Sequence, residues 1–135
     1  MICDLMGRAV AVSLAFGVAC SGRALAQEDF PFGRELLLDV RPMKGSKRVP
    51  SLEVQADGTA AVDLWCDSVE SRIALSADAV VISFGEKTNR QCAQERAQAD
   101  EALIDALRQV TKWRWDGETM LLTGGKELRF RLQTN

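Results

Sequence analysis

The two cysteines Cys66 and Cys92 are the residues of this chain whose chemistry is easiest to predict. The chain has 135 residues and four cysteines, and Cys3 and Cys20 lie in an N-terminal segment that resembles an export signal. Export leaves one pair, and an even pair in an oxidising compartment forms a disulfide. We therefore predict a Cys66–Cys92 disulfide. A redox-active or metal-binding pair is the alternative, but such pairs usually occur in a C-x-x-C motif or among four ligands.

Catalytic groups are scarce in this sequence. The chain contains no histidine and no tyrosine, which excludes mechanisms that use a histidine base and metal sites that use histidine ligands. Asp67 and Glu70 lie near Cys66, and paired carboxylates can act as acid and base, but no motif places them in a cleft. Ser68 and Ser71 lack a histidine base. We expect no catalytic residues, no metal, no cofactor and no enzymatic activity.

Tryptophans near the C-terminus are candidates for contact with a ligand. Trp113 and Trp115 are two residues apart in an expected strand, so their side chains lie on one face of it. Packing in the core is one interpretation, and a stacking platform for a small molecule is the other. Trp65, beside Cys66, is expected near the disulfide, facing either the helix or the solvent.

Three arginines are candidates for contact with a partner. Arg114, Arg129 and Arg131 are expected on the outward face of the closing strands. If strands 112–115 and 126–132 are neighbours, these side chains form a basic strip suited to an anion or an acidic partner. An ordinary solvated face is the alternative.

A second basic cluster, Lys44, Lys47 and Arg48, lies in a polar loop that ends at Pro50. Loop charges are usually only solvated. Contact with anionic lipid head groups is the alternative if the chain is anchored to a membrane through a lipid on Cys20.

The first 26 residues have the composition of a signal peptide. Arg8 supplies a positive charge, and Ala9 to Ala19 is an apolar run of eleven residues, which is too short to span a bilayer. Residues 24–26 read Ala-Leu-Ala, the small-x-small pattern that precedes a cleavage site. We predict cleavage before Gln27, a lead-in segment over 27–33 and one domain over 34–135.

Two details of this N-terminal segment stay open. Met6 is an alternative start, because it gives a cleaner positive region. Residues 17–20 resemble a bacterial lipobox, in which Cys20 would carry the lipid, although Gly17 replaces the usual leucine. A periplasmic or secreted protein is expected in the first case, and a membrane-anchored lipoprotein in the second.

The composition of the remaining 109 residues indicates one domain with a modest core. These residues carry 15 lysines and arginines and 18 aspartates and glutamates, a net charge of −3. A nucleic-acid-binding domain would have a basic excess, so nucleic acid is not an expected partner. We expect a monomer whose partner is an envelope protein or a small molecule.

The pattern of apolar residues predicts strands, then one helix, then a final meander. Between 94 and 109 the apolar residues recur at helical spacing, and Asp100 is a candidate cap for a shorter helix. Asp57-Gly58 has the composition of a type I′ hairpin turn. Tight turns favour antiparallel pairing, so we predict an α+β domain with a mostly antiparallel, curved or barrel-like sheet and one helix packed against it. The expected strands are 35–40, 51–55, 59–66, one around Ile73 and Leu75, 79–84, 112–115, 118–123 and 126–132.

This order of elements resembles the META domain (HslJ-like) family over about residues 34–133. The run WCDS at 65–68 follows a hairpin, and the run TNRQC at 88–92 precedes the helix. Family members usually have Gly-Cys-Asn at the first cysteine and Thr-x-x-x-Cys at the second, so Trp65 and Asp67 are departures.

The resemblance also suggests the Cys66–Cys92 pairing, and it implies a small envelope protein or lipoprotein without an established activity. We therefore expect an exported, non-enzymatic, disulfide-stabilised accessory or interaction module of the bacterial cell envelope. A periplasmic protein that binds a small ligand with the tryptophans of its sheet is the alternative.

Overall fold

The computed structural model describes residues 29–134, which form eight strands and one helix. The predicted signal peptide, its cleavage site and the lipobox lie outside the described residues. No helix of the described part is long and apolar enough to cross a membrane. The elements are β1 (Glu35–Leu38), β2 (Ser51–Val54), β3 (Thr59–Asp63), β4 (Ser68–Ser76), β5 (Ala79–Lys87), α1 (Gln94–Arg108), β6 (Lys112–Asp116), β7 (Thr119–Thr123) and β8 (Leu128–Leu132).

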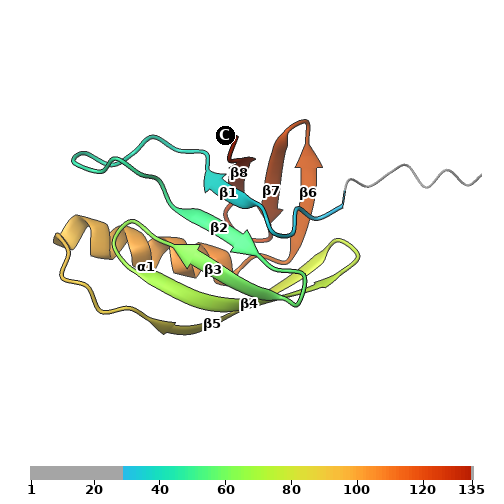
Figure 1. The fold of residues 1–135 in the computed structure, drawn as a ribbon, viewed down its shortest axis with the longest axis horizontal. Coiled ribbons are helices and arrows are strands. Elements are labelled where there is room, and N and C mark those ends of the chain that lie inside the picture. The colour runs from blue at the N-terminus through green and yellow to red at the C-terminus, as the bar shows by residue number, and fades with distance from the viewer. Residues whose placement is uncertain (1–28, 135) are drawn as a thin grey trace, which may run out of the picture.

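The eight strands form a closed antiparallel barrel in sequence order, because β1 pairs with β8 as well as with β2 (Figure 1). Consecutive strands joined by short turns pair antiparallel, as the sequence predicts. The barrel is weakest between β5 and β6, where Ala79 and Lys112 are the one pair in register. The predicted α+β fold with a barrel-like sheet and one helix is confirmed.

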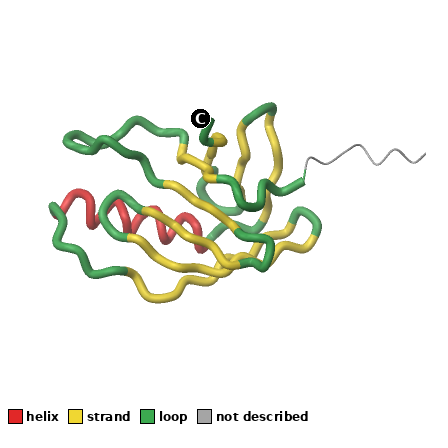
Figure 2. Tube along the Cα trace, viewed as in Figure 1, coloured by secondary structure: helices red, strands yellow, loops and turns green. Residues whose placement is uncertain are grey.

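Helix α1 returns the chain from the end of β5 to the start of β6, alongside β5 (Figures 1 and 2). Leu103, Ala106 and Leu107 on one face of α1 join the same hydrophobic core as the inward residues of the strands. The helix therefore packs where β5 and β6 have little pairing of their own. Its apolar stripe supplies core contacts at this part of the barrel.

Alternation along the strands separates the core from the surface. In β8, Leu128 and Phe130 are buried and Arg129 and Arg131 are exposed, which is the period-two pattern of a half-buried strand. The β1–β2 loop, the β3–β4 turn and the segment between β5 and α1 lie on the left in Figure 1. Residues of all three line one cleft.

Several predicted boundaries are wrong by a few residues. The strand expected over 59–66 ends at Asp63, since residues 64–67 form the turn into β4. The strand expected around Ile73 spans Ser68–Ser76, and the one expected over 79–84 continues to Lys87. These two strands are longer because they pair with each other along most of their length.

Two local predictions are also corrected. Gly58 has φ +90° but Asp57 does not have a positive φ, so the β2–β3 connection is not a type I′ turn. Gln55 and Thr59 bracket a three-residue loop, in which Asp57 Oδ1 accepts the N–H and the hydroxyl of Thr59. Asp100 is no cap, because α1 begins at Gln94 and Asp100 lies within it.

Candidate functional site

A disulfide between Cys66 and Cys92 joins the β3–β4 turn to the segment that leads into α1. Their Cα atoms are 6.0 Å apart and the two residues are separated by 26 positions. Closing a loop of this length stabilises the folded state by about 3.5 kcal/mol in the chain-entropy model. The predicted disulfide is therefore present, and it fixes the start of the helix against the barrel.

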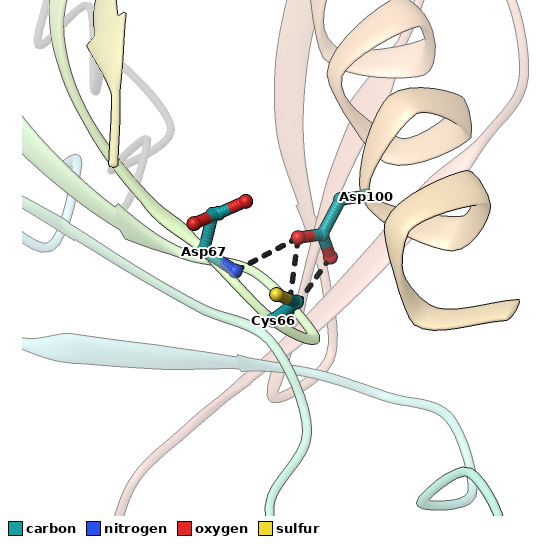
Figure 3. Close-up of side chains that lie close together, drawn as sticks. All are labelled: Cys66, Asp67 and Asp100. Atoms are coloured by element: carbon teal, nitrogen blue, oxygen red, sulfur yellow. Dashed lines mark hydrogen bonds between the residues drawn. The ribbon is translucent and has the colours of Figure 1, made fainter. Parts of the chain in front are cut away.

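A second link to the same turn comes from α1 itself, through the carboxylate of Asp100, which is fully buried. One oxygen accepts the backbone N–H of Trp65 at 2.7 Å, and the other accepts that of Asp67 at 2.8 Å. The N–H of Cys66 lies 3.2 Å from both oxygens. Figure 3 shows the carboxylate of Asp100 reaching from α1 to the turn that carries Cys66 and Asp67. The helix thus satisfies three successive donors that the turn leaves without a strand partner.

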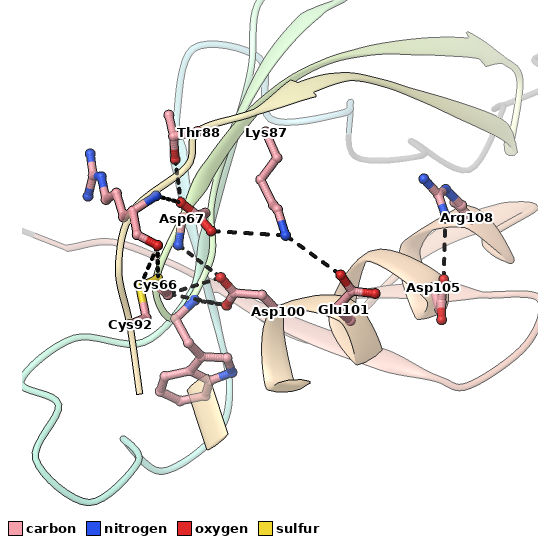
Figure 4. A network of polar contacts seen from close by, with 11 residues as sticks. Cys66, Asp67, Lys87, Thr88, Cys92, Asp100, Glu101, Asp105 and Arg108 are labelled. Carbon is pink, nitrogen blue, oxygen red and sulfur yellow. Dashed lines mark hydrogen bonds and ion pairs between the residues drawn. A yellow bond between two sulfur atoms is a disulfide. The ribbon is translucent and has the colours of Figure 1, made fainter. Parts of the chain in front are cut away.

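Asp67 makes a third link, to the segment between β5 and α1. Its Oδ1 accepts the N–H of Arg90 and the hydroxyl of Thr88, both at 2.8 Å, and its Oδ2 lies 4.0 Å from Lys87 Nζ. The Arg90 N–H lowers the pKa of Asp67 most; burial opposes it, and the Thr88 hydroxyl and the charge of Lys87 lower it further. Figure 4 shows these contacts continuing through Lys87 to Glu101 on α1.

The ligand atoms of Cys66, Asp67 and Asp100 lie within 4.8 Å of one another, a spacing compatible with a metal ion. The chemistry of these groups favours a different role. Cys66 Sγ is bonded to Cys92 and offers no thiolate, and the oxygens of Asp100 face N–H groups whose positive ends would repel a cation. The cluster is therefore suited to holding the turn in place.

Above this cluster lies a cleft of about 460 Å³. Its walls come from the β1–β2 loop, from the β3–β4 turn and from the segment that includes the first turn of α1. Trp65, which replaces the usual glycine of the family motif, is one of the lining residues. Four basic residues also line it, namely Lys47, Arg48, Arg90 and Arg96. Lys47 and Arg48 belong to the loop cluster noted in the sequence, whereas Lys44 does not line the cleft.

Trp113 and Trp115 lie away from this cleft and pack against the core. The Nε1–H group of Trp113 donates to the carbonyl of Ala77 at 3.1 Å, and its ring meets Phe30 edge-on at 5.2 Å. The Nε1–H group of Trp115 donates to the carbonyl of Asp29 at 3.4 Å. Both indoles thus hold parts of this chain, and stacking on a ligand stays a prediction.

Arg114 and Arg129 are exposed on one face of the closing meander, but their strands are not neighbours. Strand β7 lies between β6 and β8, because each short turn pairs consecutive strands. Leu121 of β7 is the partner of both arginines in register. Binding of a partner at this face stays a prediction.

Carboxylates of this chain already face two of the three arginines of the predicted strip. Arg129 forms ion pairs with Asp116 at 3.7 Å and with Glu127 at 3.2 Å. Arg131 lies 4.0 Å from Asp39. The positive potential of the strip is therefore smaller than the sequence suggests.

Asp100 is the site residue whose role sequence reasoning missed. The spacing of Asp100, Leu103 and Leu107, at i, i+3 and i+7, puts the carboxylate on the apolar face of α1. A lone acid on such a face indicates a buried carboxylate with a partner elsewhere in the fold. Arg90 and Arg96 carry no comparable signal, because only the tertiary structure brings them beside the β1–β2 loop.

Solved structures share this fold at low sequence identity. A protein from Burkholderia xenovorans matches with a TM-score of 0.61 and 18% identity, over 77% of this chain and 84% of that one. Another NMR structure matches with a TM-score of 0.58 and 14% identity, over 73% of this chain and 88% of that one.

A DUF4847-family protein from Bacteroides vulgatus matches with a TM-score of 0.50 and 18% identity, over 61% of this chain. The match spans only 57% of that protein. At these identities the likeness shows the fold alone. A comparison with curated proteins finds no match. The sequence profile of the META domain matches residues 37–135, which is most of the chain, and the chain therefore belongs to the META domain family.

Proposed function

We propose that this protein is an exported, non-enzymatic META domain of the bacterial cell envelope that acts by binding a partner or ligand. The observation that carries the proposal is the Cys66–Cys92 disulfide, which ties the β3–β4 turn to the start of α1. Disulfides persist in oxidising compartments and are rare in the cytosol. The apolar run and the Ala-Leu-Ala pattern near the N-terminus support the same compartment.

The chemistry of the buried groups supports a binding role over a catalytic one. A general acid or base must exchange a proton with its substrate, and a cysteine acts as a nucleophile in its thiolate form. Asp100 and Asp67 accept hydrogen bonds from backbone N–H groups of this chain, and the Cys66 sulfur is in a disulfide. These groups therefore fix the shape of the turn beneath the cleft.

The test is the intact mass of the protein purified from the periplasm of an expressing bacterium, with alkylation before and after reduction. The proposal predicts a chain that begins at Gln27, lacks two hydrogens and takes up an alkylating reagent only after reduction. A lipid on Cys20 would place the same domain on a membrane surface. Uncleaved protein that stays in the cytosol, with Cys66 and Cys92 freely alkylated before reduction, would overturn the proposal.

A further inference from the structure

We propose that the cleft between the β1–β2 loop, the β3–β4 turn and the start of α1 binds a phosphate group. This inference deepens the proposed binding function and rests on it. It starts from the four basic side chains that line the cleft and come from two separate stretches of the chain. Lys47 and Arg48 belong to the β1–β2 loop, Arg90 precedes α1, and Arg96 lies in the first turn of the helix.

These four basic residues have no carboxylate within ion-pair distance among residues 29–134. All the ion pairs of this part of the chain involve other basic residues, namely Lys87, Arg108, Arg129 and Arg131. The fold therefore brings together cations from distant segments without neutralising them by ion pairs. Such an excess of positive charge in a cleft attracts anions.

The balance of charges in the cleft suits a dianion. Two carboxylates, Asp63 and Asp67, line the cleft together with the four cations, so the lining has a net charge of +2. Both carboxylates already accept hydrogen bonds within the chain, Asp63 from the Ser68 hydroxyl and Asp67 from the Arg90 N–H. Asp100 lies buried beneath the floor, where three N–H groups face its charge. A phosphate monoester carries nearly two negative charges at neutral pH.

The types of the cationic residues also favour phosphate. Three of the four are arginines, whose planar guanidinium donates two parallel hydrogen bonds to the oxygens of a phosphate or a carboxylate. The volume of about 460 Å³ exceeds what a bare phosphate ion needs, so the phosphate belongs to a larger molecule. Trp65 on the wall offers that molecule an apolar surface.

The position of Arg96 shows that the cleft depends on the fold around the disulfide. Its Nη2 lies 3.1 Å from the place that a Cβ on Gly45 would occupy, so the guanidinium spans from α1 to the β1–β2 loop. The disulfide and the Asp100 carboxylate hold the start of α1 in the place from which Arg96 reaches that loop.

The experiment is isothermal titration calorimetry of the oxidised protein purified from the periplasm, at low ionic strength. Three probes are compared, namely inorganic phosphate, glycerol 3-phosphate, and vesicles of phosphatidylcholine with and without phosphatidylglycerol. Acetate serves as the monoanion control. Saturable binding of phosphate or glycerol 3-phosphate, stronger than that of acetate and weakened by salt, is the expected result.

The variants Arg48→Gln and Arg96→Gln are expected to weaken binding at least about tenfold each, the loss that corresponds to one charge-assisted hydrogen bond. Arg114→Gln is the matched control, because Arg114 is exposed, lies outside the cleft and has no ion pair in the described part of the chain. Arg131→Gln tests a neighbouring hollow of about 330 Å³ that shares Lys47 and Arg48. Both of these variants are expected to bind as the wild type does.

The outcomes separate the sources of the phosphate group. Binding of glycerol 3-phosphate without a preference for phosphatidylglycerol vesicles assigns the cleft to a soluble phosphate, and a preference for those vesicles assigns it to a lipid head group. The proposal is overturned if no probe binds, if acetate binds equally well, or if the loss in Arg131→Gln equals that in Arg96→Gln. Each of these results leaves the intact-mass test of export untouched, so a failure of the phosphate site can be told apart from a failure of export.

Discussion

The backbone N–H of Asp67 donates to the carboxylate of Asp100 at 2.8 Å, across 33 positions of sequence. Asp67 in turn uses its own carboxylate to accept the N–H of Arg90. The two carboxylates therefore join the β3–β4 turn, the segment before α1 and α1 itself. Each carboxylate accepts hydrogen bonds from backbone N–H groups that have no partner in a strand (Figures 3 and 4). The arrangement explains how a turn, a loop and a helix start keep one geometry around the cleft.

Asp100→Ala is expected to lower the free energy of unfolding by about 3 kcal/mol. It leaves the N–H groups of residues 65–67 without their acceptor, and an unsatisfied buried donor costs about 1–3 kcal/mol. Asp100→Asn keeps one acceptor oxygen, so about half of that loss is expected. Urea denaturation of the oxidised protein measures both.

Asp105→Ala is the control for this prediction, because Asp105 is exposed on the same helix and its carboxylate pairs only with Arg108 among the described residues. Its free energy of unfolding is expected to change by no more than about 0.5 kcal/mol. Equal losses at the two positions would contradict the role of Asp100.

Asp67→Asn is expected to change stability by less than about 1 kcal/mol, whereas Asp67→Ala is expected to cost about 2 kcal/mol. The reason is geometric, because both hydrogen bonds from the Thr88 hydroxyl and the Arg90 N–H go to Oδ1, which an asparagine retains. Only the weak contact of Oδ2 with Lys87 is lost. Thermal unfolding of the two variants compares them directly. A loss in Asp67→Asn as large as in Asp67→Ala would mean that the charge, not the oxygen, matters.

Stability is expected to fall in acid partly through Asp67. Its pKa is lowered in the folded state below the ordinary value of 3.8, so the native protein binds this proton less readily than the unfolded chain does. The stabilisation is therefore complete well above pH 3.8 and is lost as the pH falls below it towards the folded pKa. The pKa of Asp57 is lowered too, by its hydrogen bonds with Thr59. The difference between the wild type and Asp67→Asn isolates Asp67, and the expected gap narrows with falling pH. A gap that is constant across the acid range would contradict this assignment.

Gly124→Ala is expected to destabilise the fold by about 2 kcal/mol or more. Gly124 has φ +144°, and a Cβ there would collide with the Gln109 carbonyl and with Thr111, which follow the end of α1. Gly117 is the comparison, since it also has a positive φ, of +62°, but a Cβ on it meets nothing within 4 Å. Gly117→Ala is expected to cost only about 1 kcal/mol, from backbone strain alone. Chemical denaturation of both variants decides whether the close approach at Gly124 matters.

Local pattern was enough to predict most of the architecture. Alternation of apolar residues in 128–132 and helical spacing over 94–109 reflect the two periods at which side chains reach a core, so element types and order followed from the sequence. The cysteine count outside the predicted signal peptide identified the Cys66–Cys92 pair. Strand ends were less accurate, because where β3 stops and how far β4 continues depend on the partner strand rather than on the residues themselves.

The sequence by itself determined the family, the order of the elements and the disulfide, since each depends on residue type and spacing along the chain. Tertiary structure alone decided what the polar residues do. Asp100 receives its donors from a turn 33 to 35 positions away, and Arg96 meets a loop about 50 positions away at Gly45. Closure of the barrel and the packing of α1 create both contacts. A local sequence pattern does not show which distant segments meet, because only the folded chain brings them together.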